Sequence, residues 1–234
     1  MSAFNCPLFD EEVGNRREPY FVADDETLPL DHFYVPEHYQ DTLSHILVPH
    51  GAIMDRVEKL AWDISKDYQG TTIHMLVVLK GASTFFGDLT NALRRFHDYA
   101  RLNYIPYTFD FIRVKSYENM NSTGRVEIQG CDVSGLAGKH VLFIEDIIDT
   151  GLTMSSVIKY LKDQIKPASV RVASLVEKRT VHSCGFKADY VGFSIPNVFV
   201  CGYCLDYNEV YRDLKPLAVL NTTGIERFRD FKIQ

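Results

Sequence analysis

Residues 145–153, with the sequence EDIIDTGLT, combine several groups that could do chemistry. Asp149, Thr150, Gly151 and Thr153 bring a carboxylate, two hydroxyls and a glycine to a point where a helix is expected to begin. The free N–H groups of a first helical turn, together with the helix dipole, favour a phosphate dianion. Gly151 has no Cβ and lets the backbone approach a ligand closely. The stretch therefore predicts a phosphate site.

Two more acids, Glu145 and Asp146, directly follow the apolar residues VLFI. Such carboxylates can accept hydrogen bonds from vicinal sugar hydroxyls or hold Mg²⁺. Asp-Thr-Gly is also a motif of aspartic proteases, but that chemistry needs two such aspartates and the chain has one. The spacing of Asp146 and Asp149 loosely matches metal-binding acids of prenyl synthases, without the second motif those enzymes need. A capping role for Asp149 or Thr150 would account for one acid, not three.

Alternating strands and helices are expected to position these acids. The apolar spacing predicts a helix from near Ile53 that ends before Gly70, and a second helix that carries Phe85 and Leu93. A third helix follows residue 153. Continuous apolar runs predict buried strands at Ile73–Leu79, Val141–Ile144 and Val170–Val176. This order favours a mostly parallel sheet that is covered by helices on both faces.

The remaining segments complete an α/β fold with a central, mostly parallel sheet, flanking helices and a small hood lobe. Alternating aromatic residues predict a strand within Ile105–Ile128, and Ser116–Arg125 an exposed hairpin or mobile loop. Short strands are expected near Tyr190–Ile195, Phe199–Leu205 and Leu217–Leu220. The predicted organisation is a flexible or loosely docked tail over 1–20 and one domain over 21–234, with its core at about 50–180 and its hood from about 21–49 and 181–234.

Composition narrows the class of protein further. A formal net charge of −6 argues against duplex nucleic acid as the main partner, because such binding needs clustered Lys and Arg. No apolar run reaches the roughly eighteen residues of a membrane span, and the N-terminus lacks a signal-peptide pattern. Five cysteines over 234 residues do not suggest a disulfide framework, so we expect a cytoplasmic protein. Cys201 and Cys204 are expected to be buried on opposite sides of a strand.

Four segments together carry a resemblance to a known family. Two acids, two aliphatics and D-T-G-x-T after an apolar strand resemble the phosphoribosyl-diphosphate (PRPP) motif of type I phosphoribosyltransferases. Leu79–Gly81, Val176–Thr180 and Phe199–Asp213 then match, in order and spacing, the hypoxanthine-guanine branch of that family. The likeness runs from about Pro36 to Thr223. It implies the type I phosphoribosyltransferase fold and the synthesis of IMP or GMP from hypoxanthine or guanine and PRPP, with release of pyrophosphate through an oxocarbenium-like transition state.

The resemblance also implies roles for individual residues. The PRPP and 5′-phosphate site would comprise Glu145, Asp146, Asp149, Thr150, Gly151, Leu152 and Thr153. Asp149 would face N7 of the purine as general acid/base, a role typically worth about 10²–10⁴ in rate; helix capping alone is the alternative. Lys178 would bind O6, Phe199 would stack on the base, and Val200 would contact its edge through the backbone.

Metal and pyrophosphate sites follow from the same resemblance. Glu145, Asp146 and Asp206 would support Mg²⁺, and Asp206 would lie beside the purine as well. Lys80, Gly81 and Arg212 would bind pyrophosphate. In this family the peptide bond before the lysine can be cis, and many members have a second glycine where this chain has Ala82.

Several expectations complete the picture. Ser116 and Tyr117 resemble a mobile lid that closes over the reaction. The family implies a homodimer or homotetramer.

Two other functions stay open: a catalytically silent, nucleotide-binding relative, and a transferase for adenine or orotate. Asp149 argues against the first, and Lys178 with Phe199 against the second. The sequence leaves open whether xanthine is a substrate.

Overall fold

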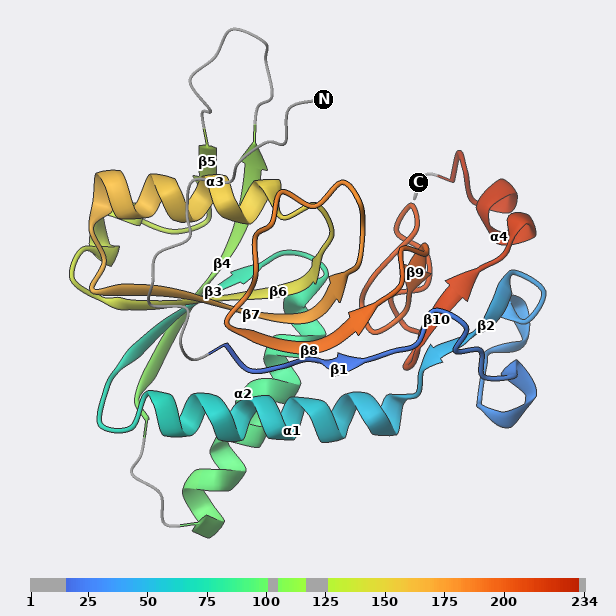
Figure 1. The fold of residues 1–234 in the computed structure, drawn as a ribbon, viewed down its shortest axis with the longest axis horizontal. Coiled ribbons are helices and arrows are strands. Elements are labelled where there is room, and N and C mark those ends of the chain that lie inside the picture. The colour runs from blue at the N-terminus through green and yellow to red at the C-terminus, as the bar shows by residue number, and fades with distance from the viewer. Residues whose placement is uncertain (1–15, 101–104, 117–125, 232–234) are drawn as a thin grey trace, which may run out of the picture.

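The computed structural model describes residues 16–100, 105–116 and 126–231. Within these residues, seven strands form a large sheet in the order β1-β8-β7-β6-β3-β4-β5 (Figure 1). Neighbouring strands pair in parallel except β4 and β5, which are antiparallel and flank residues 117–125. A smaller antiparallel sheet, called here the small sheet, has the order β2-β10-β9. The α/β class and the mostly parallel central sheet are thus confirmed.

The elements have the following bounds. The strands are β1 (Tyr20–Phe21), β2 (Leu43–Val48), β3 (Ile73–Val78), β4 (Tyr107–Ser116), β5 (Val126–Gln129), β6 (His140–Ile148), β7 (Ser169–Lys178), β8 (Tyr190–Ile195), β9 (Val200–Cys201) and β10 (Leu217–Leu220). The α-helices are α1 (His50–Asp67), α2 (Ala82–Ala100), α3 (Leu152–Tyr160) and α4 (Thr222–Arg227). Short 3₁₀ turns occupy Leu30–His32, Glu37–Tyr39 and Val133–Leu136, and a π-helical turn, Leu161–Ile165, continues α3.

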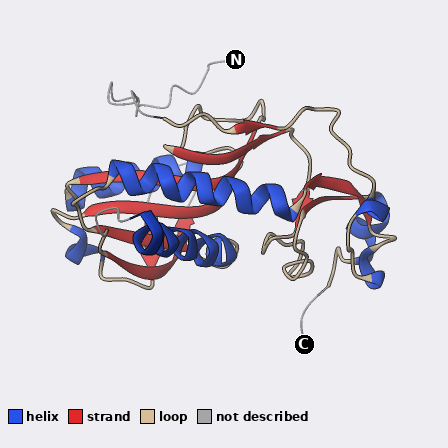
Figure 2. Ribbon diagram, turned by 90° about the horizontal axis from the view of Figure 1, so that it is seen from below, coloured by secondary structure: helices blue, strands red, loops and turns tan. Residues whose placement is uncertain are grey.

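Helices cover both faces of the large sheet because its strands are apolar on both faces. In β6, Leu142 and Ile144 join the core under α1 and α2, whereas Val141 and Phe143 join the core under α3. This alternation follows from the two-residue period of a strand. Figure 1 and Figure 2 show α1 running along the strands of the large sheet, with the small sheet beyond the N-terminal end of α1. The carboxyl ends of the parallel strands therefore face the small sheet.

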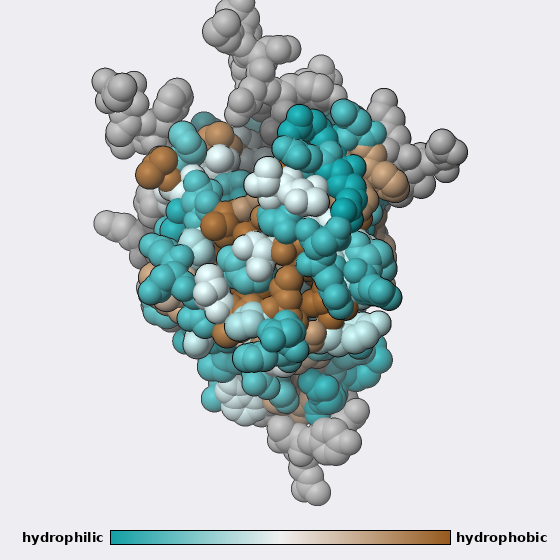
Figure 3. Space-filling model, turned by 90° about the vertical axis from the view of Figure 1, so that its right-hand side faces the viewer, coloured by the Kyte–Doolittle hydropathy of each residue, from teal (hydrophilic) through white to brown (hydrophobic). Residues whose placement is uncertain are grey.

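The small sheet has a hydrophobic core of its own. Tyr39, Ile46, Tyr211 and Leu220 belong to it and are buried. The face of the molecule on this side is mainly hydrophilic, with apolar residues gathered near its centre (Figure 3). Segments from both ends of the chain thus pack together here, as expected for the hood lobe.

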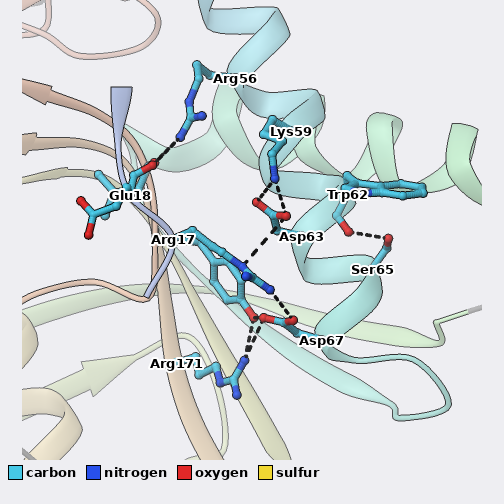
Figure 4. A network of polar contacts seen from close by, with 11 residues as sticks. Arg17, Glu18, Arg56, Lys59, Trp62, Asp63, Ser65, Asp67 and Arg171 are labelled. Carbon is cyan, nitrogen blue, oxygen red and sulfur yellow. Dashed lines mark hydrogen bonds and ion pairs between the residues drawn. The ribbon is translucent and has the colours of Figure 1, made fainter. Parts of the chain in front are cut away.

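The N-terminal segment lies along the edge of the large sheet. Tyr20 and Phe21 pair in parallel with Phe193 and Ser194 of β8. Figure 4 shows the ion pairs just before this strand: Arg17 bonds Asp67 of α1 at 2.9 Å. Residues 16–20 fall within the segment predicted to be a tail, and the described part of it is docked by these contacts. Residues 1–15 lie outside the described residues.

Among the described residues, no helix is both long and apolar enough to cross a membrane. The predicted helix near Ile53 corresponds to α1, in which Ile53, Val57, Leu60 and Ile64 are fully buried. Gly70, with φ of +74°, follows the end of this helix, in keeping with the conformational freedom of glycine.

Candidate active site

The acidic pair belongs to strand β6 rather than to the loop after it. We predicted a strand over Val141–Ile144, but β6 continues to Ile148, and Glu145 pairs in register with Ser174. The prediction stopped too early because the acids interrupt the apolar run. The strand continues because its neighbour β7 reaches Lys178 and supplies hydrogen-bonding partners for the backbone.

Glu145 and Asp146 are neighbouring acids at this strand end, and the pKa values of both are raised. Burial raises the pKa of Glu145 well above its usual value, and the charge of Asp146 adds to this effect. Burial also raises the pKa of Asp146, although Arg212 opposes that shift. Glu145 Oε2 is buried and has no hydrogen-bond partner among the described residues. A buried carboxyl oxygen without a hydrogen-bond partner is costly, and a cation or a hydroxyl-bearing ligand would satisfy it.

The acidic pair suits Mg²⁺ more than a metal held by protein ligands alone. Within the described ranges, no group of three or more His, Cys, Asp or Glu side chains is arranged to hold a metal ion. Mg²⁺ is commonly bound by one or two carboxylates, with waters and substrate phosphates completing its shell. The unpartnered oxygen of Glu145 beside Asp146 fits this mode of binding.

The loop after β6 leads into α3 through Gly151. This residue is the N-cap of α3, has φ of +78°, and makes no side-chain capping bond. Asp149 is therefore not the helix cap. A Cβ on Gly151 would lie 2.7 Å from Phe186 Cβ and 3.3 Å from Cys184 Sγ. The backbone N–H of Cys184 also donates to Thr150 O at 2.8 Å. Residues 184–186 thus pack against this loop and fix its position. They were not predicted to belong to the site.

A cation, a carboxylate and an aromatic ring meet beside this loop. Lys178 ends β7, and its Nζ lies 3.3 Å from Asp149 Oδ2 and 6.0 Å from the centroid of the Phe199 ring. The Lys178 side chain is 11% exposed, whereas that of Asp149 is 54% exposed. Phe199 is 45% exposed, and its ring packs edge-on against Tyr207. An exposed ring beside a cation and an acid suits a flat, polar ligand.

Val200 follows Phe199 directly and begins strand β9. It pairs in register with Val219 of β10, and its side chain is buried. The expected role of Val200 through its backbone is compatible with this placement, because the side chain belongs to the core and is not available to a ligand.

The loop after β3 contacts the acidic pair. The peptide bond between Leu79 and Lys80 is cis, as the resemblance implies for this family. An ideal Cβ on Gly81 would lie 1.5 Å from Asp146 Oδ2, so a side chain cannot be accommodated there without displacing the acid. Ser83 Oγ donates to Lys80 O at 2.9 Å, and α2 begins at Ala82. Gly81 is thus placed against Asp146 by packing.

A loop beside β9 completes this side of the site. Arg212 Nη2 lies 2.8 Å from Asp206 Oδ1, and its Nη1 donates to Cys204 O at 2.7 Å. Glu209 Oε2 accepts from both Lys80 Nζ, at 3.0 Å, and Arg212 Nε, at 3.1 Å. Glu209 was not predicted as a site residue, although it stands three residues before Arg212 in the segment that carried the resemblance. The loop therefore joins the two basic residues expected to bind pyrophosphate.

The prediction for the second cysteine was wrong. Cys201 is buried in β9, as expected, but Cys204 is partly exposed in a turn and has φ of +75°. Its Sγ lies 3.3 Å from Ser83 Oγ. The strand ends at Cys201 because the chain turns at Gly202, so the strand spacing assumed for the pair does not apply.

The predicted lid cannot be placed. Ser116 ends β4, and Tyr117 lies outside the described residues. The lid therefore stays a prediction.

Comparisons with known proteins agree with this fold. The family described as "Phosphoribosyl transferase domain" matches residues 45–208. The chain is 46% identical over 217 residues to a hypoxanthine-guanine-xanthine phosphoribosyltransferase of Plasmodium falciparum, covering 92% of this chain and 94% of that protein. It is 48% identical over 222 residues to the human hypoxanthine-guanine phosphoribosyltransferase, covering 93% of this chain and 100% of that protein.

A solved structure shows the same architecture. The hypoxanthine-guanine phosphoribosyltransferase from Schistosoma mansoni, crystallised in complex with IMP, superposes with a TM-score of 0.76 at 34% identity. The match covers 90% of this chain and 99% of that one. The fold and the sequence are those of a phosphoribosyltransferase, and the chain belongs to that family. Its expected place in the hypoxanthine-guanine branch is confirmed.

Proposed function

We propose that this chain is a purine-salvage enzyme that makes IMP and GMP from hypoxanthine or guanine and PRPP. The observation that carries the proposal is the meeting of Lys178, Asp149 and Phe199 beside the N-terminus of α3. Relatives with this family's name and an IMP-bound neighbour support it. In the reaction, N9 of the purine bonds to C1′ of the ribose while the bond from C1′ to the pyrophosphate oxygen breaks.

The first turn of α3 would hold the 5′-phosphate. The N–H groups of Gly151, Leu152 and Thr153 stand at the start of the helix, where backbone donors have no partner within the helix. Their positive partial charges favour a phosphate dianion. The hydroxyls of Thr150 and Thr153 can add further hydrogen bonds. This arrangement would fix the ribose so that C1′ faces the base.

Asp149 would act as the general acid/base. Its carboxylate accepts the proton that leaves N7 as N9 attacks C1′, and returns it in the reverse reaction. Lys178 donates to this carboxylate in the described structure. When a 6-oxopurine stacks on Phe199, the same ammonium can donate to O6 instead. A 6-amino group offers a donor where Lys178 needs an acceptor, so the site would select hypoxanthine and guanine.

Glu145, Asp146 and Asp206 would hold Mg²⁺, which when bound would supply positive charge that neutralises the departing pyrophosphate. Lys80, the backbone of Gly81 and Arg212 would bind the pyrophosphate, and guanidinium geometry suits its oxygens. The oxocarbenium-like transition state needs shelter from water. We assign that shelter to a lid at Ser116 and Tyr117. A cytoplasmic setting and a homodimer or homotetramer remain predictions that rest on the family.

A panel of bases tests the proposed function. Purified protein with PRPP, Mg²⁺ and either hypoxanthine or guanine is expected to form IMP or GMP, detected by chromatography. Orotate is expected to give no product, adenine is expected to react far more slowly than the 6-oxopurines, and the result with xanthine shows whether that base is also a substrate. Failure with both 6-oxopurines, beside an active control enzyme, would refute the enzyme and favour a silent nucleotide-binding relative.

The variant Asp149→Asn tests the proposed acid/base. We expect kcat to fall by about 10²–10⁴, the usual contribution of a general acid/base, because the amide cannot take up a proton. PRPP binding, measured by calorimetry, should stay within about twofold, since the phosphate is held by the helix N-terminus. Equal loss of binding and turnover would instead indicate a structural role for Asp149.

A further inference from the structure

Glu209 bridges two cations that the proposed function assigns to pyrophosphate. One oxygen atom, Oε2, accepts from Lys80 Nζ at 3.0 Å and from Arg212 Nε at 3.1 Å. These two basic side chains come from different parts of the chain, the loop after β3 and the loop after β9. Their charges would repel each other without an anion between them. Glu209 supplies that anion.

The loop holds Glu209 in this position. Its backbone N–H donates to Asp206 Oδ2 at 2.7 Å, and its φ is +69°, an uncommon value for a residue other than glycine. The hydrogen bonds from Arg212 and then Lys80 lower the pKa of the Glu209 carboxyl, so it is ionised at neutral pH. Its side chain remains 37% exposed. A ligand can therefore reach the carboxylate and compete with it.

Arg212 would keep its place if Glu209 left. Its Nη1 donates to the carbonyl oxygen of Cys204 and its Nη2 contacts Asp206, both independently of Glu209. Displacement of Glu209 would thus free Lys80 Nζ and Arg212 Nε together while the guanidinium stays fixed. Two donors aimed at one point suit an oxygen of pyrophosphate, whose anionic charge is larger than that of one carboxylate.

We propose that Glu209 is an internal counter-anion, which occupies the pyrophosphate subsite between turnovers and sets its affinity for PRPP and pyrophosphate. This inference rests on the proposed function. Binding of either ligand must displace the carboxylate, and its return assists release of pyrophosphate. Glu209 is a positioning residue in this scheme, because it acts through Lys80 and Arg212.

The variant Glu209→Gln in the full chain tests this competition. We expect pyrophosphate and PRPP, each with Mg²⁺, to bind about 3- to 10-fold more tightly by calorimetry, since two exposed ion pairs no longer compete. IMP should bind within twofold of its original affinity, because its single phosphate belongs at the start of α3. Unchanged or weaker binding of pyrophosphate would overturn the proposal.

Two further variants distinguish the effect of the hydrogen-bonded bridge formed by Glu209 from the effect of its negative charge alone. Glu226→Gln removes one exposed charge in α4 and should leave all three affinities unchanged. Glu209→Asp keeps the charge but is too short to bridge both cations, so it should also tighten pyrophosphate binding. Equal tightening of IMP, or the same gain in Glu226→Gln, would indicate a general charge effect and overturn the proposal. If Glu209→Asp did not bind pyrophosphate more tightly, the proposed competition between the bridging carboxylate and pyrophosphate would be refuted.

Steady-state kinetics provide a second measurement, and its values would not change if the role of Glu209 were only structural. Glu209→Gln should lower KM for PRPP and the inhibition constant of pyrophosphate together, by the same 3- to 10-fold. In the background of Lys80→Met, whose cation is gone, the gain should be smaller. If Glu209→Gln tightened binding equally in the Lys80→Met background, the proposed role of the bridge between Lys80 and Arg212 would be refuted. Pyrophosphate binding does not require turnover, so failure of this test is distinguishable from failure of the base panel.

Discussion

Lys178 and Asp149 meet because neighbouring strands end at the same edge of the sheet. Strands β6 and β7 are parallel, and Ile148 pairs in register with Glu177. The next residue of each strand therefore emerges at the same level. Successive side chains of a strand point to opposite faces, which turns Glu177 toward Arg16 and Lys187 while Lys178 faces the site. The same strand register thus places Glu177 in buried ion pairs and Lys178 beside Asp149 in the candidate active site.

Lys178→Gln should weaken the selection of 6-oxopurines. Hydrogen bonds to charged groups contribute about 1.5–3 kcal/mol, so kcat/KM for hypoxanthine and guanine should fall about 10- to 100-fold. Activity with adenine should not fall in parallel, because adenine has no O6. Initial rates with the three bases measure this ratio. Lys159→Gln, an exposed position in α3, is the matched control. An unchanged ratio of hypoxanthine to adenine would contradict the assignment of Lys178 to O6.

Gly81→Ala should abolish most activity while the protein stays folded. Its Cβ would lie 1.5 Å from Asp146 Oδ2, so either the loop or the acid must move. We expect kcat/KM for PRPP to fall at least about 100-fold, as a displacement near 1 Å typically costs. Gly87→Ala is the control, since a Cβ there meets nothing within 4 Å. In the helix it should add about 0.5–1 kcal/mol of stability. Full activity of Gly81→Ala would contradict the contact.

At the scale of elements, apolar spacing predicted the central strands and helices well. Strand β8 and strand β10 have the predicted bounds, and helix α1 has the predicted apolar face. Such elements are determined by burial of their own side chains, which a local pattern reports. The end of β6 was missed because its pairing depends on β7, a partner distant in sequence, and not on local hydrophobicity.

The loop that carries Glu209 could not be predicted in the same way. Tyr203, Cys204, Asn208, Glu209 and Tyr211 all have positive φ values, between 50° and 75°. Residues other than glycine rarely adopt this conformation, so the sequence carries no clear signal for it. The conformation brings Arg212 and Glu209 together and turns Cys204 out of the expected strand. Contacts with the loop after β3, rather than local preference, determine this part of the site.

The pairing of β3 with β4 provides a pH-dependent contact. His74 Nδ1 lies 2.6 Å from Thr108 Oγ1, and its Nε2 lies 3.1 Å from Asp110 Oδ2. Burial lowers the pKa of His74 below its ordinary 6.5; Lys139 acts in the same direction and Asp110 against it. Below pH 6.5 the unfolded chain therefore binds the proton more readily than the folded chain. Stability is fully present above pH 6.5 and is lost as the pH falls toward the folded pKa.

His74→Gln should reduce this loss of stability in acid. We expect the free energy of unfolding to fall less between pH 7.5 and pH 5.5 in the variant than in the original chain. Urea unfolding followed by fluorescence of Trp62, the single tryptophan, measures the difference. His182→Gln removes an exposed histidine and should keep the original pH dependence. Identical slopes for His74→Gln and the original chain would rule out His74 as the titrating group.

At the scale of the whole molecule, a few polar contacts tie distant segments together. Asp67, at the end of α1, accepts hydrogen bonds from Arg17, from Arg171 of β7 and from the Tyr190 hydroxyl of β8. Directly after the end of β7, the Arg179 guanidinium donates to the carbonyl oxygens of Val22 and Ser194. The N-terminal segment is thus joined to the edge strand whose neighbour, β7, ends with Lys178. Docking of this segment and the placement of the candidate site share the same strands.

Asp67→Asn should test how much this network contributes to stability. The substitution keeps the shape of the side chain but leaves Arg17 and Arg171 without their shared carboxylate, which is only 14% exposed. Loss of one partner from a largely buried ion pair is expected to cost about 2–4 kcal/mol of unfolding free energy. Urea unfolding at pH 7.5 measures it. Asp55→Asn, an exposed acid in the same helix, should change stability by less than about 0.5 kcal/mol. The network would be energetically unimportant if both variants unfolded alike. If Asp67→Asn also raised KM for purine more than kcat fell, the network would extend its influence through β7 to Lys178; an unchanged KM would confine its role to stability.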